Sequence, residues 1–207
     1  MAYSIDSSTE DCYEGTTCLI NKLGIRDEKL LEETEGAYTL GKASLLELQP
    51  LEGSFDFAHY KRIHYFLFCD LYEWAGKVRT VNLSKKGTAF VPADEIEQCA
   101  EACFSRMTQT DFSALSRKEA VAEIADFYNT VNMLHPFREG NGRTQRIFFT
   151  QWVRHLGYDI DLSQMDADML MIATIHGAQG VLDDLLSFFD EMLIEPPRQE
   201  CDMNLIF

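Results

Sequence analysis

The sequence predicts a single, all-α domain, a helical bundle that carries one small β-hairpin. Three observations support this fold class. The chain has 207 residues, the usual size of one domain. Apolar residues recur at helical spacing through most of its length. Residues 78–91 are instead rich in strand-forming side chains around a polar turn. We expect residues 1–12 to be a flexible N-terminus, 13–195 the domain, and 196–207 a C-terminal tail.

The first half of the chain predicts two helices and the hairpin. Residues 27–48 are helical in composition, and residues 57–74 are aromatic on all sides, which is typical of a buried helix. Gly76 is expected to break that helix. The hairpin then places residues 84–87 in its turn and is bounded by Pro92.

The second half predicts helices that flank a glycine-rich loop. Ser116 with Glu119 forms a capping box, and the helix it opens is expected to end near His135, because Pro136 disfavours helix at the residue before it. Helical periodicity resumes at Arg143 and closes at Gly157. The remaining helices are expected at 94–107, 163–176 and 181–193.

Composition excludes several classes of protein. Hydrophobic residues make up 46% of the chain and charged residues 25%, which argues against a disordered chain. The net charge of −16 opposes nonspecific binding to nucleic acid or to an anionic membrane. No apolar run approaches the roughly 18 residues that a bilayer requires. The six cysteines include no CxxC pair, and the first ten residues show no secretory signal, so we expect free thiols in a cytoplasmic protein.

Two basic islands stand out in this acidic chain. One lies in 74–93, which has no acidic residue, and the other in 136–158, where Glu139 is the only acid. Their basic residues are Lys77, Arg79, Lys85 and Lys86 in the first, and Arg138, Arg143, Arg146 and Arg154 in the second. The islands suggest an anion site, although charge alone leaves chance clustering equally open.

Residues 135–146, with the sequence HPFREGNGRTQR, predict a helix, a tight polar loop and a second helix. Gly140 and Gly142 allow backbone N–H groups to converge on an anion, and the next helix adds its N-terminal dipole. Arg143 and Arg146 lie three residues apart, so both project from one helix face, and guanidinium groups suit phosphate oxygens. The P-loop pattern is absent.

Two further side chains in this segment carry chemistry. Glu139 offers a hard oxygen that could hold Mg²⁺ between phosphates, and His135 could act as a general base. A lone histidine at a helix end is more often structural, so the combination within one short segment carries the argument. A helix C-terminus favours charged His135, whereas nearby arginines and Mg²⁺ oppose it. The sequence leaves that balance open.

The segment resembles the signature of the Fic family, HPFx(D/E)GNGRxxR, at every defined position. The resemblance extends to the YEGTT stretch that starts at Tyr13, to LGI from Leu23, to WAGKVR from Trp74 and to QRIFF from Gln145. It covers roughly residues 12–193 and resembles short bacterial members. It implies the Fic fold.

The resemblance implies an enzyme that transfers AMP from ATP to a Tyr, Thr or Ser hydroxyl of a target protein and releases pyrophosphate. His135 would deprotonate the hydroxyl, Phe137 would anchor the loop, and Glu139 would hold Mg²⁺ between the α- and β-phosphates. Gly140, Asn141 and Gly142 would cradle the phosphates. Arg143 would bind the leaving diphosphate, and Arg146 would bind the γ-phosphate. The hairpin would be a flap that pairs with the target's main chain through Ser84, Lys85, Lys86, Gly87, Thr88 and Phe90.

The sequence does not exclude a different function for this fold. Some relatives of the Fic fold phosphorylate, transfer phosphocholine or remove AMP. The phosphorylating branch replaces the second motif glycine by lysine, so Gly142 favours adenylylation. A non-catalytic interaction module or a phosphate-binding regulatory module also stays open, although no motif residue is lost here.

Regulation is the last expectation. Fic proteins are commonly restrained by a helix in which Ser or Thr precedes, by four residues, a Glu followed by Gly or Asn; that Glu pairs with the second motif arginine, here Arg146. Glu-Gly occurs at 14, 35, 52 and 139, but none has the required Ser or Thr, and the nearest relaxed match is Ser187 with Glu191. We therefore expect a separate small antitoxin to supply this helix.

Overall fold

The computed structural model describes residues 4–5, 11–85, 87–162 and 167–194. Within them lie seven α-helices, one 3₁₀ helix and three short strands. The α-helices are α1 (Glu28–Leu48), α2 (Phe57–Phe68), α3 (Ile96–Gln109), α4 (Arg117–Leu134), α5 (Asn141–His155), α6 (Ala167–Ala178) and α7 (Asp183–Met192), and η1 is Phe112–Ala114. The strands are β1 (Ser4–Ile5), β2 (Leu83–Lys85) and β3 (Thr88–Ala89). The all-α class with one small hairpin is confirmed.

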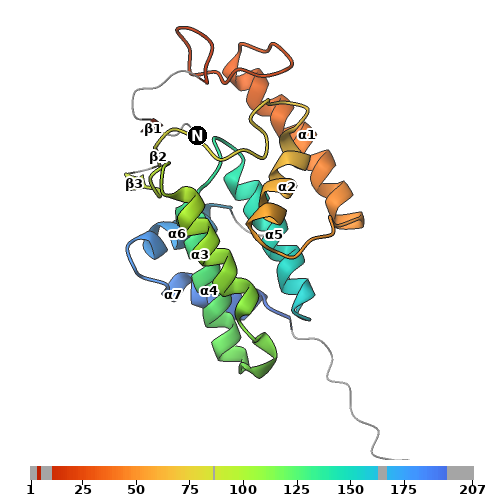
Figure 1. Ribbon diagram of the computed structural model, residues 1–207, viewed down its shortest axis with the longest axis vertical. Coiled ribbons are helices and arrows are strands. Elements are labelled where there is room, and N and C mark those ends of the chain that lie inside the picture. Colours follow the sequence, from red (N-terminus) through yellow and green to blue (C-terminus); the bar gives the residue numbers. More distant parts are fainter. Residues whose placement is uncertain (1–3, 6–10, 86, 163–166, 195–207) are drawn as a thin grey trace, which may run out of the picture.

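Helix α4 is the centre of the bundle. It contacts α3, α5, α6 and α7, while α5 also packs on α2, and α2 on α1 (Figure 1). The interior between α2, α3 and α5 is aromatic: Tyr60 stacks on Phe137, makes an edge contact with Phe148 and a tilted contact with Phe104. This packing fixes α5 between α2 and α4, and it therefore fixes the loop that joins α4 to α5.

The helix ends follow local sequence rules. The capping box at Ser116 and Glu119 is present, and α4 ends at Leu134 with His135 as its C-cap, as the sequence predicts. Helix α5 begins at Asn141, two residues before the predicted start at Arg143, because Gly140 alone makes the turn into it. Helices α3, α6 and α7 lie within a few residues of expectation, and the predicted start at residue 163 lies outside the described residues.

The predicted helix over 57–74 is wrong in its second part. Helix α2 ends at Phe68, and the chain continues through tight turns in which Leu71 and Tyr72 both donate to the carbonyl of Phe68. Those side chains remain buried, so the all-round apolar pattern reports burial rather than helix. Gly76 has φ 75°, and a Cβ there would lie 2.8 Å from Cβ of Tyr65.

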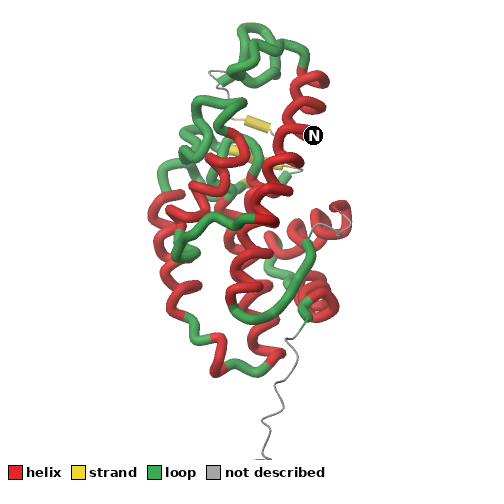
Figure 2. Tube along the Cα trace, turned by 90° about the vertical axis from the view of Figure 1, so that its right-hand side faces the viewer, coloured by secondary structure: helices red, strands yellow, loops and turns green. Residues whose placement is uncertain are grey.

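The small sheet has three strands in the order β1-β2-β3, all antiparallel. Ser84 and Lys85, expected in the turn, lie in β2 instead. The N-terminal strand pairs Ser4 with Ser84 and Ile5 with Leu83. Figure 1 shows the strands at the end of the bundle where α5 begins, and Figure 2 shows the same strands in yellow after a turn of 90°.

The described helices include none that is both long and apolar enough to cross a bilayer. The tail expected at 196–207 lies outside the described residues.

Candidate active site

The loop 135–140 joins α4 to α5 and is framed by two residues in the left-handed conformation. His135 has φ 40° and Gly140 has φ 80°. At Gly140 a Cβ would lie 2.1 Å from Cζ of Phe68, so both the backbone angle and the close packing require glycine. The chain therefore turns sharply at each end of the loop, and the C-terminus of α4 meets the N-terminus of α5.

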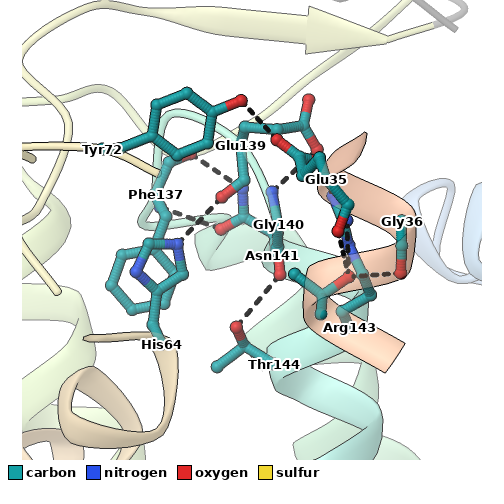
Figure 3. A network of polar contacts seen from close by, with 11 residues as sticks. Glu35, Gly36, His64, Tyr72, Phe137, Glu139, Gly140, Asn141, Arg143 and Thr144 are labelled. Atoms are coloured by element: carbon teal, nitrogen blue, oxygen red, sulfur yellow. Dashed lines mark hydrogen bonds and ion pairs between the residues drawn. The ribbon is translucent and has the colours of Figure 1, made fainter. Parts of the chain in front are cut away.

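The backbone of this loop is held by side chains from several elements. Asn141 brackets Phe137: its Oδ1 accepts from the Phe137 N–H at 2.8 Å and its Nδ2 donates to the Phe137 carbonyl at 2.7 Å. Thr144 Oγ1 donates to the carbonyl of Gly140 at 3.0 Å (Figure 3). The amide of Asn141 is thus committed to the loop, so that only its backbone is left to cradle a phosphate.

His64 of α2 braces the loop from a distance in sequence. Its Nδ1 accepts the N–H of Gly76 at 2.8 Å, which places the proton on Nε2, and Nε2 lies 3.0 Å from the carbonyl of Glu139. Its ring stacks on Phe137 with centroids 3.8 Å apart. Phe137 is fully buried in this stack.

His135 is buried and neutral at pH 7. Burial is the main cause that lowers its pKa to about 3, aided by the charges of Lys85 and Arg79 and opposed by the bond to Asn132. That bond joins Nδ1 to the carbonyl of Asn132 at 3.2 Å, so Nδ1 carries the proton and the lone pair is on Nε2. Desolvation therefore exceeds the effect of the helix C-terminus, which would favour the charged form.

The flap lies directly on this histidine. The ring of Phe90 stacks on that of His135 with centroids 3.7 Å apart and an interplanar angle of 8°. Lys85 of β2 is close enough for its charge to lower the pKa of both His135 and Glu139. Thr88 lies in β3, Gly87 turns the chain with φ 81°, and Lys86 lies outside the described residues.

Arg79 joins the flap to the loop, which differs from its interpretation as part of a basic anion site. It is 4% exposed, and its guanidinium donates to the carbonyls of His135 at 2.8 Å, Val81 at 2.6 Å and Val91 at 2.5 Å. Its backbone N–H donates to Pro136 O at 2.9 Å. Burial lowers its pKa to about 10, so it remains charged at pH 7. Its role is to fix the segments that lead into and out of the hairpin beside His135.

Arg138 and Arg154 are likewise committed elsewhere. Arg138 pairs with Asp11 at 3.2 Å, and Arg154 pairs with Glu47 at 2.5 Å and Asp159 at 3.0 Å. Of the arginines in the two islands, Arg143 and Arg146 are therefore the ones placed on the first turns of α5 for an anion. The backbone N–H groups of that turn have no intrahelical acceptor, as at any helix start.

Glu139 lies at this helix start. Its Oε1 accepts the N–H of Gly140 at 2.7 Å and lies 3.5 Å from Nη2 of Arg143 (Figure 3). Burial raises the pKa of the carboxyl; the charge of Glu35 adds to the rise, whereas Gly140 and Arg143 oppose it. Gly142 is next to the guanidinium of Arg146, 3.3 Å from a Cβ built on it. Arg146 itself forms no ion pair with the residues that the structure describes.

At the start of α5 the protein offers a divalent metal one carboxylate, that of Glu139, and not a complete set of ligands. Among the described residues, no group of three His, Cys, Asp or Glu side chains could hold a metal ion. The single carboxylate of Glu139 fits Mg²⁺ when phosphates and water supply the other ligands, because Mg²⁺ is commonly bound in that way.

The sequence profile of the Fic/DOC family matches residues 54–153. The chain is 37% identical over 184 residues to the "Probable protein adenylyltransferase y4lH" of Sinorhizobium fredii, covering 88% of this chain and 94% of that protein. It is 31% identical over 189 residues to the "Probable protein adenylyltransferase Fic" of Escherichia coli K12, covering 91% and 94%.

The chain belongs to the Fic/DOC family.

Solved Fic structures share the fold. The BepC protein of Bartonella tribocorum with bound AMPPNP superposes with a TM-score of 0.83 at 27% identity, covering 91% of this chain and 98% of that one. A Fic domain from Bartonella quintana with bound ADP gives a TM-score of 0.84 at 28% identity, covering 90% and 95%.

Several residues of this Fic site were not predicted from the sequence. They are Glu35, Thr39, His64, Tyr72 and Asn132, together with the buried role of Arg79. Each is remote from residues 135–146 or bonds through the backbone, and ordinary residue types at no fixed spacing give no signal. Glu35 did occur in the search for an inhibitory glutamate, but the structure places it on Arg143 rather than on Arg146.

Proposed function

We propose that this chain is a protein adenylyltransferase that transfers AMP from ATP to a Tyr, Thr or Ser hydroxyl of another protein in the cytoplasm. The observation that carries the proposal is the buried His135, stacked under the flap residue Phe90 and joined by one short loop to the start of α5, where Arg143 lies in the first turn. Relatives named protein adenylyltransferase, and similar structures that hold AMPPNP or ADP, support it.

Each residue of the motif has its own role in the proposed reaction. Nε2 of His135 accepts the proton of the target hydroxyl as its oxygen bonds to the α-phosphorus. The bond from the α-phosphorus to the bridging oxygen breaks, and pyrophosphate leaves. Arg143 and Arg146 hold the leaving phosphates, and the backbone around Gly140 and Gly142 donates to them. Glu139 would hold Mg²⁺, which neutralises phosphate charge when it is bound.

Target docking by the flap has one candidate edge. The β2 side of the hairpin is paired with β1, whereas β3 is the edge strand of the described sheet. We therefore expect an extended segment of the target to pair with β3 and bring its hydroxyl to His135.

The test uses ATP labelled on the α-phosphate or on the γ-phosphate with a whole-cell lysate. Adenylylation predicts labelled protein from the α-label only, with an AMP mass gain on a hydroxyl residue. Transfer of the γ-label would indicate phosphorylation and would overturn the proposal. Loss of AMP from a modified protein would indicate the reverse reaction, and the absence of any labelled protein would favour a non-catalytic module.

Metal binding gives a second check. Because Glu139 is a single carboxylate, Mg²⁺ should bind with the nucleotide and not to the chain alone. Calorimetry is expected to show no binding of Mg²⁺ at about 1 mM, roughly the level at which a one-carboxylate site stays weak. Tight binding without nucleotide would contradict the assignment of Glu139.

We also propose that a separate small antitoxin restrains the enzyme through Arg146. Arg146 has no ion-pair partner within the described part of the chain, and the internal candidate Glu191 is exposed at the end of α7. Expression of the chain alone should slow growth, and His135→Ala should relieve it. A harmless, inactive chain that Glu191→Gly activates would instead mean that restraint is internal.

A further inference from the structure

Helix α1 buries an unusual pair of polar side chains. Four residues of its 21 are buried, and two of the four, Glu35 and Thr39, are polar. Both lie one turn apart on the face toward α5, where they meet Arg143 (Figure 3). A buried carboxylate is costly unless its oxygens are paired, so the contacts of Glu35 explain why it is retained there.

Both carboxylate oxygens of Glu35 are bound by protein side chains. Oε1 accepts from Nη2 of Arg143, and Oε2 accepts from the hydroxyl of Tyr72. Tyr72 is 1% exposed and stacks on Trp74 with centroids 4.2 Å apart, so its hydroxyl is itself held in place. The Tyr72 hydroxyl therefore holds Glu35 from the side opposite Arg143. Glu35 cannot turn toward a ligand without breaking its hydrogen bond to Tyr72.

The guanidinium of Arg143 is held through its two terminal nitrogens, Nη1 and Nη2. Nη1 donates to Oγ1 of Thr39 at 3.2 Å while Nη2 meets Glu35, and Cζ lies 4.9 Å from the ring centroid of Phe68. An arginine carries five N–H donors. With Nη2 shared between Glu35 and Glu139, the donors on Nε and the second on Nη1 have no acceptor among the described residues.

Arg143 has two carboxylates within reach, and the structure shows which one it prefers. Glu139 Oε1 lies 3.5 Å from Nη2, a longer contact than that with Glu35. The side chain of Glu139 is 26% exposed and that of Glu35 is 9% exposed. Glu35 thus draws the guanidinium toward α1, which leaves Glu139 facing the site.

We propose that Glu35 is a positioning residue for the nucleotide: it orients Arg143 toward the β-phosphate and keeps that arginine from closing on Glu139. The inference rests on the proposed nucleotide substrate. Tyr72 and Thr39 complete the positioning device, Tyr72 by orienting Glu35 and Thr39 by holding Nη1. This assigns a function to α1, which contributes no residue to the motif itself.

The inference predicts an effect that depends on the ligand's phosphates. ADP has the β-phosphate that Arg143 contacts, and AMP lacks it. Glu35→Gln keeps the size of the side chain but removes its charge. The variant should therefore weaken ADP binding by about tenfold, the usual order for one charge-assisted hydrogen bond. AMP binding should stay within about twofold, because AMP does not use Arg143.

Calorimetric titration of the full chain with ADP and with AMP, in the absence of divalent metal, measures this ratio. Glu32→Gln is the matched control, because it is the same substitution at an exposed position on the same helix. Tyr72→Phe should weaken ADP binding by a smaller factor, about threefold, since it removes only the support of Glu35.

A double-mutant cycle separates positioning from general destabilisation. If Glu35 acts through Arg143, Glu35→Gln added to Arg143→Ala should cost no further ADP affinity. Equal loss of ADP and AMP affinity would mean that Glu35 is merely structural, and tighter ADP binding by Glu35→Gln would mean that it blocks the site. Unchanged ADP affinity would also overturn the inference.

These titrations need no AMP transfer, so the two proposals fail separately. If wild-type chain modifies no protein but shows the expected ADP and AMP pattern, the proposed reaction is wrong and the positioning role stands. If transfer occurs and the pattern is absent, the positioning role is wrong.

Discussion

His64 contacts the loop 135–140 from helix α2, whereas His135 begins that loop, and the two histidines share most of their physical properties. Both are buried, both have a pKa lowered to about 3 with burial as the main cause, and each stacks on a phenylalanine ring, with centroids 3.8 Å and 3.7 Å apart. They differ in what their nitrogens meet. His64 has one nitrogen on Gly76 N–H and the other on the carbonyl of Glu139. His135 has Nδ1 on Asn132 O and lies under the flap.

The difference shows that a lowered pKa does not identify a general base. Burial makes both imidazoles neutral, which is a requirement for the role but not evidence of it. His64 is committed to holding two backbone segments together. His135 lies where the flap, the loop and the start of α5 meet, so position assigns the chemistry. Four experiments test this distinction, beginning with the largest expected effect.

Removing the imidazole of His135 should abolish transfer while leaving the nucleotide site in place. We expect His135→Ala to lower the rate of AMP transfer by about 10²–10⁴-fold, the usual cost of losing a general base. ADP affinity, measured by calorimetry, should be nearly unchanged because no phosphate contact is removed. Transfer at a rate close to that of wild type would end the assignment of His135 as base.

His64→Ala should act on stability instead. It removes the ring that stacks on Phe137 and leaves the Gly76 N–H and the Glu139 carbonyl without their partner. We expect a loss of about 2–4 kcal/mol in the free energy of unfolding, typical of a buried deletion that also leaves unpaired polar groups. Urea denaturation measures it. A change below about 0.5 kcal/mol, the level of a surface substitution, would show that His64 does not brace the loop.

The two histidines should also make stability depend on pH. Each has a folded pKa below its unfolded value of 6.5, so the unfolded chain binds more protons between pH 6.5 and about 3. Stability should therefore fall as the pH falls through that range, by about 2 kcal/mol per histidine from pH 6.5 to 5. Urea denaturation at both pH values tests this, and His135→Ala should reduce the loss by the contribution of one histidine, about 2 kcal/mol. An unchanged slope in that variant would mean that His135 is not buried in its neutral form.

The smallest effect concerns the flap. Phe90 N–H donates to Leu83 O at 3.1 Å, so the alternation of antiparallel pairs turns the Ala89 N–H outward from β3. Ala89→Pro removes that donor, and we expect transfer to a protein target to fall by roughly tenfold with ADP affinity unchanged. Ala89→Val retains the N–H and is the control. Equal loss of transfer and ADP binding would make the hairpin only structural.

Much of the site could be predicted because it is contiguous. Residues 135–146 carry their own geometry: proline ends one helix, glycine makes the turn, and the next helix presents its N–H groups and arginines. The same local rules placed the capping box at Ser116 and the hairpin between β2 and β3. They failed at 69–74, where turns bury the same apolar side chains that a helix would bury.

The sequence did not predict which of the basic residues would be available to bind an anion. Arg79, Arg138, Arg143, Arg146 and Arg154 look alike in two basic islands. In the fold, Arg79 binds three backbone carbonyls and Arg138 and Arg154 form structural ion pairs. Burial and partner choice depend on which segments become neighbours, and no local spacing records that.

The sequence by itself determined the helical class, the loop and the motif that belongs to the Fic/DOC family, because each follows from residues within a few positions of one another. The tertiary structure decided that Glu35 lies on Arg143, 108 residues away, that His64 supports Glu139, 75 residues away, and that His135 is neutral. Those outcomes depend on the packing of α1, α2 and the flap around the loop, since desolvation and hydrogen bonding act through space rather than along the chain.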